Sequence, residues 1–176
     1  LNIWTREPDL KNWKNLNSTI RALNEEVQIA VVGKYVHLVD CYKSLNESLK
    51  HAGFANKVKV KLKFVDSEGL ESKDLKEVFD GCSGILVPGG FGDRGVDGKI
   101  ASIQYARENH IPFFGICLGM QILGKSSTED GFTEGLGLVE NEVIKFEKSN
   151  TYGNKIPHIG FNSVNLLPFK YNPFKF

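Results

Sequence analysis

Several features are scarce in this 176-residue sequence, and each scarcity excludes a class of protein. Lys and Arg number 22 against 21 Asp and Glu, and a net charge of +1 gives no electrostatic case for nucleic acid or an anionic membrane surface as main partner. Only three cysteines occur, widely spaced at positions 41, 82 and 117, which favours a reducing, cytoplasmic compartment over a disulfide scaffold. The longest apolar stretch, residues 111–123, is interrupted by Pro and Gly and is too short to cross a bilayer.

The composition of the sequence is typical of a single globular domain. Apolar residues account for 41% and charged residues for 24%, and the length is sufficient for a sizeable core. Residues 1–26 stand apart, because Trp4, Leu10, Trp13 and further apolar residues recur there at helical spacing. We expect residues 1–26 to form a helical linker or arm, and residues 27–176 to form the domain itself.

From residue 27 onward, strand-like and helix-like apolar patterns alternate. Strand patterns fall at 27–33, 58–65, 84–90 and 111–116, and helical patterns fall at 42–53, 70–79, 96–109 and from 118 onward. This alternation predicts an α/β fold, an open and mostly parallel sheet with helices on both faces. Past residue 131 the pattern changes, and we expect strands at 136–146 and 161–167. Ligands bind beyond the carboxyl ends of such strands, so the candidates follow residues 33, 87 and 116.

The strongest candidate is Cys117, in the segment Gly-Ile-Cys-Leu-Gly at 115–119 between a strand and a helix. A sharp strand-to-helix turn lifts one side chain above the sheet edge, and flanking glycines remove side chains that would collide with backbone. The following helix N-terminus favours the thiolate, and the Leu118 N–H can stabilise an oxyanion. A buried, inert cysteine between two packing glycines is the structural alternative.

A glycine-rich turn, Pro-Gly-Gly-Phe-Gly-Asp-Arg-Gly at 88–95, directly follows the strand residues Gly-Ile-Leu-Val. Such a turn presents backbone N–H groups that can hold a phosphate or an oxyanion. It is neither a Walker A loop nor a dinucleotide fingerprint, because Lys99 is followed by Ile100 and the G-x-G-x-x-G spacing is absent. Beside a cysteine elbow, we interpret the turn as the second half of an oxyanion hole. A purely structural turn is the alternative.

Two polar residues after Cys117 are further candidates for substrate binding. Gln121 lies one helical turn later, where it can face the same pocket, and a Gln in an apolar segment needs a hydrogen-bond partner. Glu129 is a candidate anion for a substrate ammonium, or else a solvated loop acid or helix cap. No His pair has the spacing of metal ligands, so the sequence predicts no metal.

Four segments together resemble the glutaminase domains of CTP synthases, which are class I glutamine amidotransferases. They are VGKY at 32–35, LVPGGFGDRG at 86–95, GKIASIQYAREN at 98–109 and PFFGICLGMQ at 112–121, within a likeness over residues 27–121. Residues 115–168 are more similar to the glutaminase subunit of imidazole glycerol phosphate synthase, through EGLGLVENEVIKF and KIPHIGFNSV. The resemblance implies a glutaminase that serves CTP formation, and a glutaminase subunit for histidine biosynthesis is the alternative within the class.

The resemblance also implies a mechanism and roles for residues. Cys117 would attack the side-chain amide of glutamine, giving a glutamyl thioester and ammonia, and water would then release glutamate. The oxyanion would be held at Gly90 and Leu118, and glutamine would be bound by Gly90, Phe91, Gln121 and Glu129. The loop through which GTP activates CTP synthases is matched by Arg94, Gly95 and Asp97, with Asp97 where Glu is usual.

Other parts of the enzyme are implied to lie outside this domain. The domain itself would hold no cofactor, while ATP and Mg would bind in a separate amidoligase (synthase) domain or subunit that accepts ammonia within a larger oligomeric enzyme. The family completes its catalytic triad with a His and a Glu, and no such pair follows Cys117; His158 lies in a different context. Either the pair lies beyond Phe176, so that the domain is incomplete at its C-terminus, or the chain is a non-catalytic, amidotransferase-like partner domain.

Overall fold

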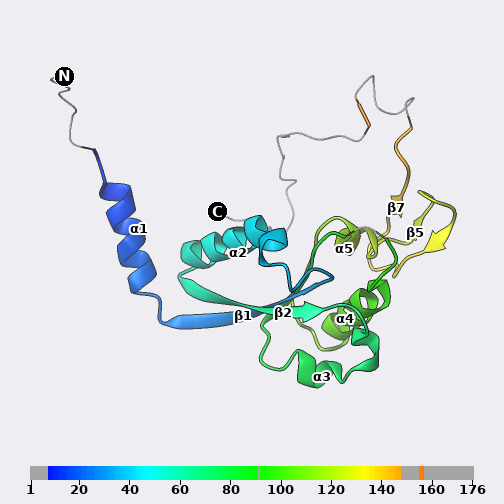
Figure 1. Cartoon of the computed structure of the whole chain (residues 1–176), viewed down its shortest axis with the longest axis horizontal. Helices are drawn as coiled ribbons and strands as arrows, with labels where there is room; N and C mark the ends of the chain where they lie inside the picture. Colours follow the sequence, from blue (N-terminus) through cyan, green and yellow to red (C-terminus); the bar gives the residue numbers. More distant parts are fainter. Residues whose placement is uncertain (1–7, 91, 148–154, 157–176) are drawn as a thin grey trace. The chain divides into compact units, whose positions relative to one another are not determined.

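The computed structural model describes residues 8–90, 92–147 and 155–156 (Figure 1). By its internal contacts the chain divides into two compact units, Leu1–Ile122 and Leu123–Phe176, and each is considered by itself. The division expected between residues 26 and 27 stays a prediction. Among the described residues, no helix is both long enough and apolar enough to cross a membrane.

A four-stranded parallel sheet forms the core of the first unit. Its strands are β1 (Glu25–Gly33), β2 (Val58–Asp66), β3 (Gly84–Val87) and β4 (Phe113–Gly115), in the order β2-β1-β3-β4. The two central strands are the most deeply buried, because residues 30–32 and 85–87 are at most 3% exposed. The predicted open parallel sheet is therefore confirmed, with β3 ending at Val87 rather than at residue 90.

The order of the strands determines which face each helix covers. α2 (Lys43–Ala55) connects β1 to β2, whereas α3 (Leu75–Val78) and α4 (Val96–Glu108) lie on connections that run across the sheet in the opposite direction. Because parallel crossovers are right-handed, α2 lies on one face and α3 and α4 on the other, as Figure 1 shows. The strand order reverses between β1 and β3, which is where ligands bind in sheets of this kind.

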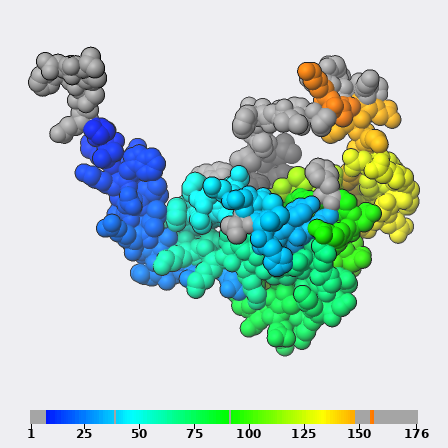
Figure 2. Space-filling model, viewed as in Figure 1, coloured from blue at the N-terminus to red at the C-terminus, as the bar shows by residue number. Residues whose placement is uncertain are grey.

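Helices and turns outside the sheet complete the first unit. α1 (Lys11–Arg21) confirms the helix expected near the N-terminus; it buries none of its residues, and its atoms (dark blue in Figure 2) are open at the surface. Two 3-10 turns, η1 (Val39–Tyr42) and η2 (Leu70–Ser72), precede α2 and α3. α5 (Leu118–Gln121) is only one turn long.

In the second unit, the strand expected over 136–146 is wrong for most of its length. Only β7 (Glu142–Val143) is a strand there, and it pairs with β5 (Ser126–Ser127), which also pairs with β6 (Thr133–Glu134). Gly137 has a φ of +60°, and its N–H donates to the Gly124 carbonyl oxygen at 2.9 Å, so the chain turns where an extended strand was expected. The strand expected over 161–167 lies outside the described residues.

The first testable consequence of the fold concerns Gly98 in α4. A Cβ atom at this position would overlap the Ser67 carbonyl oxygen and would lie 2.8 Å from Leu70 Cβ. Gly98→Ala should therefore lower the free energy of unfolding by about 1–3 kcal/mol, although Gly→Ala inside a helix ordinarily raises it by about 1 kcal/mol. Urea denaturation measures the change, with Gln104→Ala at an exposed position of α4 as the matched control. A Gly98→Ala protein as stable as the parent would contradict this packing.

Candidate active site

The segment between β4 and α5 forms the elbow that the sequence predicts. Cys117 lies at its apex with φ +51° and ψ −117°, a backbone conformation that residues other than glycine rarely adopt. Its carbonyl oxygen accepts hydrogen bonds from the N–H groups of Met120 and Gln121, both at 2.9 Å. Cys117 is exposed, so its thiol can be reached from solvent, contrary to the buried and inert alternative.

Close approach of backbones requires glycine at both ends of the elbow. A Cβ atom on Gly115 would overlap the Gly119 carbonyl oxygen, and one on Gly119 would overlap the Val87 carbonyl oxygen. The same Val87 oxygen accepts the Ile116 N–H at 3.0 Å, so β3, β4 and α5 meet through backbone atoms. The predicted reason for the two glycines, room for neighbouring backbone, is confirmed.

The elbow is followed by a single helical turn rather than by a long helix. Leu118, the first residue of α5, directly follows Cys117, and Gln121, the last, donates its N–H to the Cys117 carbonyl oxygen. The electrostatic help that the sequence predicts from a helix N-terminus is limited to this one turn. The roles of Leu118 and Gln121 in binding stay predictions.

The glycine-rich turn after β3 lies between the elbow and two lysines. A Cβ atom on Gly89 would lie 3.0 Å from Cys117 Cβ and 3.3 Å from Sγ. At the next residue, a Cβ atom on Gly90 would lie 3.2 Å from Lys99 Nζ and 3.4 Å from Lys34 Cε. Of these two consecutive glycines, Gly89 is therefore the one nearer the Cys117 thiol, and Gly90 is the one nearer the lysine side chains.

Lys99 is fully buried on α4, with 0% of its surface exposed. Its Nζ has no hydrogen-bond partner among the residues that the structure describes. Burial is the main cause that lowers the pKa of Lys99 below its ordinary value, and the nearby charge of Lys34 lowers this pKa further. Lys34 is 7% exposed, and its Nζ donates to the Gly92 carbonyl oxygen at 3.1 Å.

Neither lysine was among the residues predicted from the sequence for this site. Their positions were the available signal, because Lys34 directly follows the first strand and Lys99 lies in the first turns of the helix after the glycine-rich turn. In an open parallel sheet, both places border the carboxyl ends of strands.

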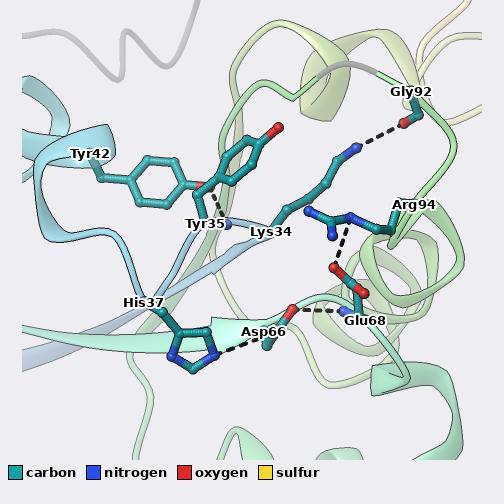
Figure 3. A network of polar contacts seen from close by, with 8 residues as sticks. All are labelled: Lys34, Tyr35, His37, Tyr42, Asp66, Glu68, Gly92 and Arg94. Carbon is teal, nitrogen blue, oxygen red and sulfur yellow. Dashed lines mark hydrogen bonds and ion pairs between the residues drawn. The ribbon is translucent and has the colours of Figure 1, made fainter.

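Side chains from three strand ends form a polar network beside the turn (Figure 3). Arg94 Nε lies 2.9 Å from Glu68 Oε1, and His37 Nε2 lies 3.7 Å from Asp66 Oδ2. Because these side chains are largely exposed, each pair contributes less than about 1 kcal/mol to stability. The Arg94–Glu68 pair instead connects the glycine-rich turn to the segment that follows β2.

The other predicted site residues fall in different parts of the chain. Gly95 has a φ of +72° and is the N-cap of α4, and Asp97 is exposed in its first turn. Glu129 belongs to the second unit, where it is exposed. Phe91 and His158 lie outside the described residues. The functions assigned to these residues stay predictions.

Comparison with known proteins places this arrangement in a family. The model of the family "Glutamine amidotransferase class-I" matches residues 37–167. That range begins just after β1 and includes the glycine-rich turn and the cysteine elbow. The chain belongs to the class-I glutamine amidotransferases, and the resemblance inferred from its motifs is confirmed.

Within this family, the chain is similar to CTP synthases. The CTP synthase of Desulfotalea psychrophila is 60% identical over 122 residues, which are 69% of this chain and 22% of that protein. The CTP synthase of Syntrophus aciditrophicus is 57% identical over 122 residues, 69% of this chain and 23% of that protein. The chain thus spans about a fifth of the length of these relatives.

A solved structure, "Trypanosoma brucei CTPS - glutaminase domain with bound acivicin", is 49% identical to this chain. The match covers 54% of this chain and 38% of the solved chain, with a TM-score of 0.49. The likeness of residues 115–168 to the glutaminase of imidazole glycerol phosphate synthase stays a prediction.

The contact between Gly89 and the elbow makes the accessibility of the Cys117 thiol testable. Gly89→Ala places a methyl group 3.3 Å from Sγ, so alkylation of Cys117 by iodoacetamide should slow several-fold. Peptide-resolved mass spectrometry measures the rate at each cysteine. Exposed Cys41 is the internal control, and its rate should not change. Equal rates at Cys117 in the parent and the variant would contradict the described approach of the turn.

The burial of Lys99 predicts an unusual gain of stability. Lys99→Met removes a buried amine that lacks a partner among the described residues, so the free energy of unfolding at pH 7 should rise by about 1–3 kcal/mol. Because the folded chain releases the Lys99 proton at lower pH than the unfolded chain does, the parent becomes more stable as pH rises toward the unfolded pKa of about 10.5. The advantage of the variant should therefore shrink at high pH.

Urea denaturation at pH 7 and at pH 10 measures this gain. Exposed Lys76→Met is the control, since it removes the same charge at the surface and should change stability by less than about 0.5 kcal/mol. A Lys99→Met protein that is less stable than the parent at pH 7 would show that the buried ammonium stabilises the fold.

Proposed function

We propose that the chain is the glutamine-hydrolysing unit of a CTP synthase. Cys117 attacks the side-chain amide carbonyl of glutamine, ammonia leaves as the glutamyl thioester forms, and water then releases glutamate. The observation that carries this proposal is the exposed thiol at a positive-φ elbow, in contact with a glycine-rich turn. Similarity to CTP synthases supports the proposal that the ammonia passes to a separate synthase part, which converts UTP to CTP with ATP and Mg²⁺.

The turn and the elbow divide the binding of glutamine between them. The N–H groups of Gly90 and Leu118 hold the oxyanion, because they belong to the two backbone segments nearest the thiol. The rest of the glutamine is bound by Phe91, Gln121 and Glu129. Membership of the family supports these three roles through the matched positions in the sequence.

A GTP effector acts through the loop that carries Arg94, Gly95 and Asp97. Arg94 supports this role, since its guanidinium is largely exposed and it belongs to the same glycine-rich turn as Gly90. Its present partner is the Glu68 carboxylate, which a nucleotide phosphate can replace with the same charge-assisted hydrogen bonds. GTP binding would then act on the turn that holds the oxyanion.

Replacement of the nucleophile tests the proposed function directly. Cys117→Ser should abolish glutamate release from glutamine with little change in the free energy of unfolding, because one atom at an exposed position is exchanged. A coupled glutamate assay measures turnover, with and without a CTP synthase amidoligase part. Cys41→Ser, at an exposed cysteine outside the elbow, is the matched control and should keep the parent's activity. Turnover that survives Cys117→Ser would refute the nucleophilic role.

A further inference from the structure

Lys99 is the one fully buried charged side chain of the described residues, and the proposed mechanism does not use it. Its position is specific, because its Nζ lies 3.2 Å from where a Cβ atom on Gly90 would be. No ion pair joins it to a described residue, and the carboxylates of Glu68 and Asp66 pair with Arg94 and His37 instead. A buried amine without a counter-ion costs stability, so the fold retains Lys99 against its own stability.

The amine lies beside the glycine-rich turn that is proposed to hold the oxyanion. A Cβ atom on Gly89 would lie 3.3 Å from Cys117 Sγ, whereas one on the next residue, Gly90, would lie 3.2 Å from Lys99 Nζ and 3.4 Å from Lys34 Cε. Lys34 already donates its Nζ hydrogen to the Gly92 carbonyl oxygen, which leaves Lys99 as the cation without a described acceptor. In the low dielectric of the interior, a positive charge here acts on the turn with little screening.

We infer that the Lys99 ammonium is a positioning charge for the oxyanion site and acts through residues 88–90 of the glycine-rich turn. The inference rests on the proposed function. When the Cys117 sulfur forms its bond to the glutamine carbonyl carbon, the π electron pair of the carbonyl moves onto oxygen and creates the negative charge. In this role Lys99 acts only through its charge: it transfers no proton to the reacting atoms and touches no substrate. Its field favours the charged oxygen over the neutral carbonyl, so its effect falls on the transition state.

Two thiol reagents separate this effect from a change in the thiol or in the fold. The diazoketone analogue of L-glutamine alkylates cysteine with its ketone oxygen in the oxyanion site; the thiol proton moves to the diazo carbon, sulfur bonds to that carbon and N₂ leaves. Iodoacetamide alkylates the same sulfur by displacing iodide and needs no oxyanion site. The ratio of the two labelling rates at Cys117 therefore reports the oxyanion site, and mass spectrometry of the Cys117 peptide measures both rates.

For Lys99→Met, this ratio should fall about tenfold. Loss of a direct oxyanion donor lowers the rate by about 10²–10³, and the effect of Lys99 is smaller because it acts through the turn and not on the oxygen itself. Lys99→Arg, which keeps the charge at every accessible pH, should restore the ratio to within about threefold of the parent. Lys76→Met, which removes an exposed charge, should leave the ratio unchanged. Urea denaturation checks that each variant is folded.

Each contrary outcome overturns the inference in a distinguishable way. An unchanged ratio in folded Lys99→Met, with the parent labelled normally, refutes the role of Lys99 and leaves the proposed function standing. An equal fall with both reagents shows an effect on the thiol or the fold, and likewise refutes it. If iodoacetamide labels parental Cys117 but the diazoketone does not, the proposed function itself fails and the inference fails with it.

Discussion

The site depends on one constraint, the direct contact of three backbone segments at the end of the sheet. Gly119 lies against the Val87 carbonyl oxygen, and Gly115 lies against the carbonyl oxygen of Gly119. A side chain at either glycine would push α5 away from β3. Cys117 could then relax to an ordinary backbone conformation, so its positive φ is maintained by this packing and not by any preference of its own.

The strand order brings the other groups to the same place. Because β1 and β3 are parallel neighbours and the order reverses between them, the segments after these strands start at the same edge and run toward opposite faces of the sheet. Lys34 follows β1, the glycine-rich turn follows β3, and the elbow follows β4 next to it. Residues far apart in the sequence thus meet at one edge through topology alone, before any specific side-chain contact is made.

The sequence predicted the parts of this site that depend on backbone chemistry. Glycines on both sides of Cys117, between a strand and a helix, indicate a tight turn, and alternating strand and helix patterns lead to a parallel sheet. The burial of Lys99 could not be predicted, because a lysine early in a helix is ordinarily solvated and its burial depends on how distant strands pack. The strand expected over 136–146 failed for a related reason. Its apolar residues alternate only at 136–138 and 144–146, and Val139, Ile144 and Phe146 remain 48–69% exposed, so no core selects an extended backbone there.

Two residues near the same pair of glycines, Cys117 and Lys99, each lower the stability of the fold. Cys117 has a positive φ, which is unfavourable for residues with a side chain, and Lys99 has a buried amine without a described partner. Packing alone accounts for neither, because Met would fill the Lys99 position and an ordinary turn would connect β4 to α5. Local costs of this kind persist where they serve chemistry, and here both converge on the turn formed by Gly89 and Gly90. A thiol that must be exposed and an oxyanion that must be stabilised account for the two costs together, which is why the turn, rather than the cysteine alone, defines the site.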